Sequence, residues 1–281
     1  MSNRSLPYLL LLPATAFLCL FFLYPFALVA FDSVTRDGAY SLDNFRRMAG
    51  HWKFSTAFWN TILLAAVVVP IQLSMALAMA SIVSRLQAGR SAILYVFAIP
   101  LGISDLAAGL IWLAIFEQSG FLNSLLVSLG VVEKPILLLS YQNAWVIFVA
   151  IVLAEVWRAT AIMMVILVAG MGLIPKEYGE AAEVFGATRW QRFTRVTLPM
   201  LKPSLQTALI LRVILAFEVF AVVVALGGTQ LPVLMSETYH WQFAMRERGV
   251  AAAYAMVILG ISIAFTILIL RLLHVPKEAR P

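Results

Sequence analysis

Five ionisable residues lie inside long apolar segments of the chain, where a charged side chain is costly. They are Asp105, Glu155, Arg158, Arg212 and Glu218. Each charge costs at least ~2.5–3.5 kcal/mol at the centre of a membrane helix, so these side chains should face protein or a polar cavity. Glu155 and Arg158 are three residues apart and can touch along one helix face. The pattern is typical either of ion pairs that lock a helix bundle or of a polar site near the middle of a membrane.

Other groups that could do chemistry form no recognisable site. The histidines His51, His240 and His274 are isolated along the sequence and lack the spacing of metal ligands. The sequence contains neither a nucleophile elbow nor a G-x-x-x-x-G-K-[ST] loop that would cradle nucleotide phosphates. We therefore expect no catalytic activity, no metal and no cofactor, and an intramembrane enzyme is disfavoured.

Long membrane helices must position the five charged residues. The chain has 281 residues, of which 62% are hydrophobic and 12% charged, whereas soluble proteins have roughly 45–50% and about 25%. Single apolar runs long enough to cross a ~30 Å hydrocarbon layer predict helices and not barrel strands. They occupy residues 7–31, 55–83, 92–116, 143–171, 204–226 and 249–272. We expect an all-α, polytopic membrane protein with six transmembrane helices in a single domain over residues 1–281.

The first apolar segment could also be a signal peptide. Its apolar run is longer than a usual signal-peptide core, and no small-residue cleavage site ends it before Asp32. We interpret it as an uncleaved first span.

The distribution of basic residues predicts the orientation in the membrane. With both termini in the cytoplasm, the inside segments hold eleven lysines and arginines, among them Arg4, Lys277 and Arg280, and the outside segments hold seven. Cytoplasmic loops normally carry this excess. The net charge of +6 is therefore explained by membrane topology, and nucleic acid is not an expected partner.

The long inside loop over residues 172–203 predicts two short helices joined at a glycine. Pro175 suits the first turn of a helix, and Gly186 can end that helix in the left-handed conformation. Thr188 and Gln191 stand at the spacing of a capping box, which predicts the start of the second helix. A projecting helix of this kind can seat in the groove of another protein. The alternative is an amphipathic loop lying on anionic lipid.

The residues of this loop resemble the EAA loop of binding-protein-dependent ABC transporter permeases. That loop reads E-A-A-x-x-x-G, with Leu-Pro beginning twelve residues after the glycine. Here Glu180-Ala181-Ala182 is followed by Gly186 and then by Leu198-Pro199 at the same spacings. Phe185 departs from the pattern, since aspartate often stands before the glycine in the carbohydrate-importer branch that the rest of the chain resembles. Glu218 likewise stands where aspartate or asparagine is frequent.

The resemblance implies a function and a set of partners. It implies a transmembrane permease subunit of an ATP-driven importer for a sugar, polyol or sugar derivative, similar to the maltose and glycerol-phosphate permeases. The implied partners are a second homologous permease, two cytoplasmic ATP-binding subunits and an extracytoplasmic solute-binding protein. The implied location is the lipid of a bacterial or archaeal plasma membrane.

The resemblance also assigns roles to residues of this chain. The loop 172–203 becomes a cytoplasmic coupling-helix loop that contacts the ATPase through Glu180, Ala181, Ala182 and Gly186. The substrate pathway is expected at Glu155, Arg158, Arg212, Phe217 and Glu218. Aromatic rings can stack on the C–H faces of sugars, although rings in spans more often pack or mark interfaces.

The chemistry of the substrate and one rival function stay open at this point. Arg158 and Arg212 would match carboxylate, phosphate or sulfonate oxygens, whereas pairing with Glu155 and Glu218 would leave a neutral site for an uncharged sugar, which we favour. The rival is an ion- or proton-coupled secondary transporter that uses the buried charges as a relay. Inverted repeats and discontinuous spans would support the rival, and neither is visible in the sequence.

Overall fold

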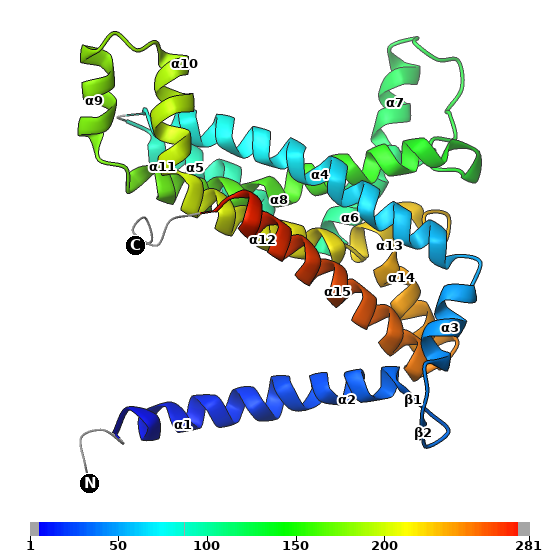
Figure 1. Cartoon of the computed structure of the whole chain (residues 1–281). Helices are drawn as coiled ribbons and strands as arrows, with labels where there is room; N and C mark the ends of the chain where they lie inside the picture. The colour runs from blue at the N-terminus through cyan, green and yellow to red at the C-terminus, as the bar shows by residue number, and fades with distance from the viewer. Residues whose placement is uncertain (1–5, 87, 275–281) are drawn as a thin grey trace. The chain divides into compact units, whose positions relative to one another are not determined.

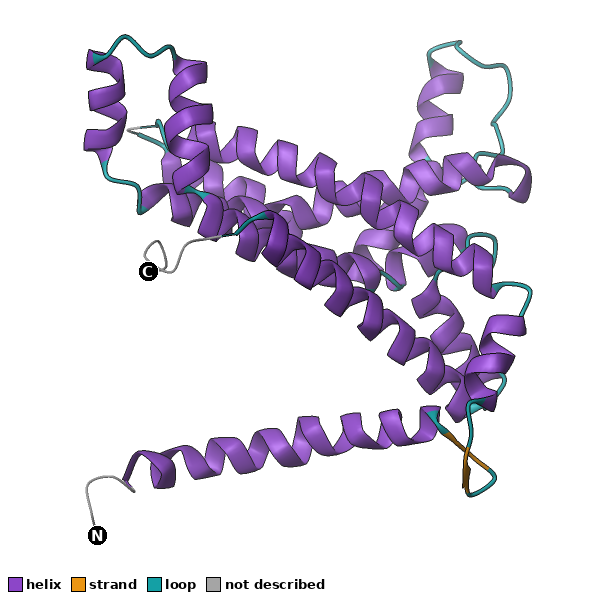
Figure 2. Ribbon diagram, in the orientation of Figure 1, coloured by secondary structure: helices purple, strands orange, loops and turns teal. Residues whose placement is uncertain are grey.

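The structure, a computed structural model, describes residues 6–86 and 88–274. These residues fold almost entirely into helices, with one short β-hairpin (Figures 1 and 2). Three residues of the predicted charge bias, Arg4, Lys277 and Arg280, lie outside the described residues. The chain divides into two compact units, Met1–Ser55 with Leu234–Leu259 and Thr56–Val233 with Gly260–Pro281. A single functional domain over residues 1–281 stays a prediction.

The first unit begins with a long apolar helix that corresponds to the predicted span 7–31. Helix α1 (Leu6–Leu18) continues through a π-helical turn (Cys19–Leu23) into α2 (Tyr24–Ser33). None of its most apolar 18-residue window is buried in the structure. An apolar surface of this size requires lipid or another protein chain to cover it.

A short hairpin and a buried asparagine follow this helix. Strands β1 (Thr35–Arg36) and β2 (Ala39–Tyr40) pair antiparallel, with Thr35 opposite Tyr40. Helix α3 (Asp43–Gly50) then places Asn44, 2% exposed, beneath the hairpin. The Asn44 amide donates hydrogen bonds of 3.0 Å to the carbonyl oxygens of Asp32 and Thr35. A buried side chain thereby satisfies main-chain acceptors that the turn leaves free.

The last elements of the first unit are α14 (Leu234–Tyr239), a π-helical turn (His240–Ala244) and the start of α15 (Arg248–Leu272). Arg47 of α3 donates two hydrogen bonds, of 2.9 and 3.0 Å, to the carboxylate of Glu247. This bidentate bond lowers the pKa of Glu247 below its ordinary value. The pair ties α3 to the start of α15.

The second unit is built around α8 (Ala144–Gly172), which corresponds to the predicted span 143–171. Two-thirds (67%) of its most apolar window is buried, against 33% for α4 (Phe54–Val83). The buried residues of α4 recur every three or four positions, so one face of this helix packs inward and the other stays free. Helix α12 (Lys202–Phe217) also packs on α8, and α13 (Ala221–Gly227) packs on both α8 and α6 (Asp105–Phe116).

The third predicted span, 92–116, is wrong as a single helix. Helix α5 (Arg90–Ala98) runs into a 3₁₀ turn (Ile99–Gly102), and α6 begins only at Asp105. Pro100 removes a backbone donor at the turn, and the Ser104 hydroxyl accepts a hydrogen bond of 3.2 Å from the amide of Ala107, which starts a new helix. The candidate span of this region is Asp105–Ser128, which consists of α6, a turn at 117–120 and α7 (Phe121–Ser128).

The fifth predicted span, 204–226, is interrupted as well. Helix α12 ends at Phe217 with Glu218 as its C-terminal cap, and α13 begins at Ala221. The apolar residues on both sides hide this break in the sequence. Within the described residues, five helices are long and apolar enough to cross a membrane. A sixth crossing requires the pair Arg189–Met200 and Lys202–Phe217, bent by 71°, to count as one span. The all-α, multi-span prediction is confirmed, and the bounds of the third and fifth predicted spans are corrected.

A glycine permits the close packing of α6 on α13. A Cβ atom built at Gly109 would lie 2.7 Å from the Ala225 side chain and 3.2 Å from the main chain of Val222. We expect Gly109→Ala to lower the free energy of unfolding by about 1–3 kcal/mol, because one of these helices must move. Thermal unfolding of the purified chain in detergent measures the effect.

Gly260→Ala is the matched control, since Gly260 also lies in a membrane helix and a Cβ there meets nothing within 4 Å. This variant should keep or raise the midpoint temperature of unfolding, because alanine favours the helical conformation more than glycine does. Equal midpoints for both variants would contradict the packing described for α6 and α13.

Candidate functional site

A completely enclosed ion pair lies in the core of the second unit. Arg212 of α12 is 0% exposed and Glu155 of α8 is 1% exposed. The Arg212 Nη2 atom lies 2.8 Å from Glu155 Oε2. The charge on each side chain is thereby compensated within the protein, as an apolar surrounding requires.

Gln72 brings a third helix, α4, into this arrangement. Its side chain is 0% exposed. Its Nε2 donates a hydrogen bond of 2.7 Å to the backbone oxygen of Glu155, and its Oε1 accepts a hydrogen bond from Nε of Arg212. An uncharged amide therefore links α4, α8 and α12 while it satisfies the arginine.

A second ion pair extends the arrangement toward the surface of the unit. Arg158 Nη1 lies 2.8 Å from Asp105 Oδ1, and Arg158 Nη2 lies 3.7 Å from Glu155 Oε1. The Asp105 side chain is 48% exposed, that of Arg158 13% and that of Glu155 2%. We call Asp105, Arg158, Glu155, Arg212 and Gln72 the charge network. Its two acids and two arginines sum to zero, and it runs from an exposed to an enclosed end.

The enclosed end of the charge network has little free space. A cavity beside it measures about 10 Å³, close to the room that one water molecule needs. Its lining residues are Leu64, Val68, Ile151, Glu155, Arg212, Ala216 and Val219. Arg212 Nη1 and Glu155 Oε1 are buried here without a hydrogen-bond partner among the described residues. In this conformation a bridging water fits beside Arg212, whereas a sugar ring does not.

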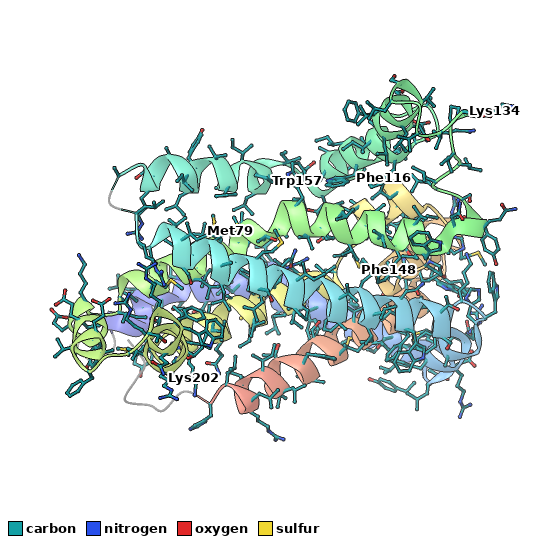
Figure 3. All side chains as sticks on the ribbon, turned by 90° about the horizontal axis from the view of Figure 1, so that it is seen from above. Met79, Phe116, Lys134, Phe148, Trp157 and Lys202 are labelled. Atoms are coloured by element: carbon teal, nitrogen blue, oxygen red, sulfur yellow. The ribbon has the colours of Figure 1, made fainter. Side chains whose placement is uncertain are left out.

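Aromatic rings accompany the exposed end of the charge network. Trp112 of α6 stacks on Phe116, with ring centres 5.7 Å apart, and meets Trp157 of α8 edge to face at 6.2 Å. Trp157 adjoins Arg158 in sequence, and Trp112 lies two helical turns after Asp105 on the same face of α6. The labels of Trp157 and Phe116 locate this region in Figure 3. Charged and aromatic side chains thus occur together on two neighbouring helices.

The remaining two residues of the predicted pathway lie outside the charge network. Phe217 is 1% exposed and packs against Phe265, with ring centres 5.1 Å apart. Glu218 is exposed at the break between α12 and α13, and among the described residues no ion pair joins it. The structure therefore brings Glu155, Arg158 and Arg212 together and leaves out Phe217 and Glu218.

The network also contains two residues that the predicted pathway omitted. Asp105 was expected to be costly in a span, but it was not assigned to the predicted pathway. Gln72 had no such signal, because a single glutamine in an apolar run does not reveal its partner. Its role follows only from the packing of α4 against α8.

The loop 172–203 forms the predicted pair of short helices. Helix α9 (Lys176–Val184) begins directly after Pro175, one position later than expected, and Gly186 ends the turn with φ +76°. Thr188 and Gln191 form the predicted capping box at the start of α10 (Arg189–Arg192). In Figure 1, α9 and α10 lie side by side and protrude from the ends of α4 and α8. An ion pair between Arg192 and Glu183 joins them.

Large apolar side chains are exposed at the tip of this loop. Val184 is 86% exposed and Phe185 is 89% exposed. Glu180, Ala181 and Gly186 are exposed, whereas Ala182 is half-buried. Two large apolar side chains exposed side by side at a turn are typical of a docking surface. In the sequence, Phe185 was noted only because it differs from the aspartate that is frequent at this position, and nothing predicted the exposure of Val184.

Comparisons with known proteins give a consistent result. The family described as binding-protein-dependent transport system inner membrane component matches residues 72–277. The chain is 31% identical to the sulfoquinovosyl glycerol transport system permease protein SmoG of Agrobacterium fabrum, over 98% of this chain and 92% of that protein. It is 29% identical to the trehalose/maltose transport system permease protein MalF of Thermococcus litoralis, over 96% and 94% of the two chains.

The fold resembles that of a solved transporter as well. One chain of a bacterial ABC transporter involved in the import of the acidic polysaccharide alginate superposes with a TM-score of 0.81. The match covers 96% of both chains at 20% sequence identity. The likeness supports the multi-span helical fold.

The charge network generates a double-mutant prediction. Arg212→Met leaves Glu155 enclosed with an excess negative charge, and we expect it to lower the free energy of unfolding by about 3–5 kcal/mol. Glu155→Gln with Arg212→Met restores neutrality and leaves the Asp105–Arg158 pair, so the double variant should be more stable than Arg212→Met alone. Thermal unfolding in detergent measures both.

Glu218→Gln removes a carboxylate from α12 outside the charge network and serves as the control, with little expected change. Glu155→Gln alone is the second single variant of the cycle. If the double variant loses as much stability as Arg212→Met and Glu155→Gln together, the coupling between Arg212 and Glu155 is refuted.

Proposed function

The chain belongs to the family of binding-protein-dependent transport system inner membrane components, and from this premise we propose that it forms half of the translocation pathway of an ATP-driven importer. The cargo is a sugar, polyol or sugar derivative. The observation that carries the proposal is the full-length similarity to permeases named for trehalose/maltose and sulfoquinovosyl glycerol. As in those relatives, the chain is a permease subunit.

The proposal places ATP chemistry and solute capture in other chains. Two ATP-binding subunits act at the cytoplasmic side, a second homologous permease completes the pathway, and an extracytoplasmic binding protein delivers the solute. Both chain termini and the loop 172–203 lie in the cytoplasm of a bacterial or archaeal cell. The charge bias of the loops supports this orientation.

The α9–α10 loop is proposed to couple the ATPase to the membrane helices. Val184 and Phe185 enter a groove of an ATP-binding subunit, and Glu180, Ala181 and Ala182 form the adjoining helix face. The left-handed Gly186, the capping box and the Arg192–Glu183 pair fix the angle between α9 and α10. A rigid loop can transmit a displacement that a flexible loop would absorb.

A continuous path leads from this loop to the charge network. The segment Arg189–Met200 joins α12 through the 71° bend, and α12 carries Arg212. Arg212 in turn holds Glu155 of α8 and Gln72 of α4. A movement of α9 and α10 therefore acts on the helices whose rearrangement would open the pathway alternately to either side.

The exposed end of the charge network is proposed to border the solute pathway. Asp105 and Arg158 supply hydrogen-bonding groups, and Trp112 and Trp157 supply flat apolar rings beside them. Sugars present both kinds of surface. Glu155 and Arg212 hold Arg158 in place from the enclosed side, and Phe217 and Glu218 border the pathway at the break between α12 and α13. Because Arg158 is already neutralised, a neutral sugar or polyol is favoured over an anionic derivative.

One structural feature is shared with the rival function. Helices broken near their middle, as at 99–104 and 218–220, also occur in ion-coupled secondary transporters. The family membership favours the ATP-driven importer.

Coupling is tested by changes at the tip of the loop. We expect Gly186→Val, which puts a β-branched residue at φ +76°, and Phe185→Asp to reduce ATP-driven uptake at least ~10-fold. Uptake and ATP hydrolysis are measured with the complete transporter in vesicles, and hydrolysis should become independent of solute. Membrane insertion should be normal because neither side chain packs on the spans.

Leu129→Asp is the control for Phe185→Asp, because Leu129 is an apolar residue, 67% exposed, just after α7. If both loop variants keep normal uptake and normal solute-stimulated ATP hydrolysis, the α9–α10 loop does not couple the ATPase to the membrane helices.

The solute pathway is tested at Arg158. With a panel of neutral and anionic sugars, we expect a neutral sugar or polyol to be carried. We expect Arg158→Gln to reduce uptake of that solute about tenfold or more, because the variant loses one charge-assisted hydrogen bond to the solute. Lys134→Gln in the loop after α7 is the control that removes a cation elsewhere. Unchanged uptake of every transported solute in Arg158→Gln would exclude this end of the network from the pathway.

A further inference from the structure

An apolar groove lies between one end of α4 and α10. It has a volume of about 560 Å³ and is lined by Ser74, Leu77, Ala78, Ser81, Arg85, Arg189, Trp190 and Phe193. Ser74, Ala78, Ser81 and Arg85 recur at helical spacing, so they form one stripe along α4 and the turn after it. The label of Met79 locates this part of α4 in Figure 3. The groove has apolar walls and two guanidinium groups.

A basic pocket adjoins the groove. It has a volume of about 600 Å³ and shares Ser81, Arg85 and Phe193 with the groove. Its other charged residues are Arg90, Lys176, Glu177 and Arg192. Arg192 is paired with Glu183, and among the described residues no ion pair neutralises Arg85, Arg90 or Lys176. The pocket therefore carries an excess of positive charge directly beside an apolar channel.

This combination matches an amphiphile with an anionic head. We propose that the groove binds an anionic phospholipid, with one acyl chain along α4 and the phosphate between Arg85 and Arg189. A free anion would leave the apolar walls in water, and a neutral lipid would leave the arginines without a counter-charge. Trp190, which is 72% exposed, has the amphipathic ring found at membrane interfaces.

The position of the groove gives the lipid a role in the loop. Arg189 and Trp190 form the first turn of α10, which continues toward α12. A lipid held between α4 and α10 would fix the base of the α9–α10 loop against the membrane helices. The proposal does not depend on which solute the transporter carries.

The experiment uses the complete transporter in lipid nanodiscs and the fluorescence of Trp190. Phosphatidylglycerol and phosphatidylcholine with brominated acyl chains quench the fluorescence of tryptophans that they contact. The difference between the wild-type protein and Trp190→Phe gives the part of the fluorescence that comes from Trp190. We expect brominated phosphatidylglycerol to quench Trp190 at about tenfold lower mole fraction than brominated phosphatidylcholine. Arg85→Gln with Arg189→Gln should bring this ratio close to one.

Two further variants separate the apolar and the charged parts of the site. Ala78→Phe fills the groove from an exposed position of α4 and should reduce quenching by both lipids. Arg271→Gln, at the end of α15 and outside both linings, should leave the preference unchanged.

Three results would overturn the proposal. Equal quenching by the two lipids would show that the arginines select no anionic head. Loss of the preference on addition of millimolar glycerol phosphate would show that the pocket holds a free anion. Quenching in the isolated chain but none in the complete transporter would show that a partner protein covers the groove. None of these results depends on uptake, so they leave the proposed transport function untouched.

Discussion

An arginine that is completely enclosed among membrane helices must find its counter-charge inside the protein, and Arg212 sets this requirement for the second unit. The alternative, a free guanidinium in an apolar surrounding, costs several kcal/mol. Glu155 of α8 and Gln72 of α4 meet the requirement together. Three helices that otherwise present similar apolar surfaces are thereby held in one register. Apolar packing in lipid alone would specify that register poorly.

The core of the second unit and its protruding loop differ in how their side chains are satisfied. In the core, the charge network is satisfied within the chain and leaves room for about one water molecule. At the protruding end, Val184 and Phe185 are kept in solvent on a turn that is fixed by a left-handed glycine and a capping box. The buried polar groups of the core are thus largely paired within the chain, whereas the tip of the loop exposes large apolar side chains. Helix α12 follows the protruding segment Arg189–Met200 after a bend of 71° and leads to the core.

Local rules predicted much of the fold and of the loop. Long apolar runs identified α4, α8 and α15 to within a few residues, because lipid demands continuous helices. Gly186 and the Thr188–Gln191 pair could be assigned because both depend only on neighbouring backbone. The breaks after Ala98 and Phe217 were concealed by apolar residues on either side. The partners in the charge network lie far apart in sequence, so spacing suggested Glu155 with Arg158, whereas the closest contacts are Glu155 with Arg212 and Arg158 with Asp105.

The neutrality of the charge network has an electrical consequence. A living cell maintains a voltage across its plasma membrane, and carrying one unpaired elementary charge through it takes about 2.3 kcal/mol per 100 mV. Asp105 and Glu155 cancel Arg158 and Arg212, so helices that shift with these pairs intact perform no net electrical work. A movement of the charge network with its pairs intact therefore adds no voltage dependence of its own to a conformational change of the protein.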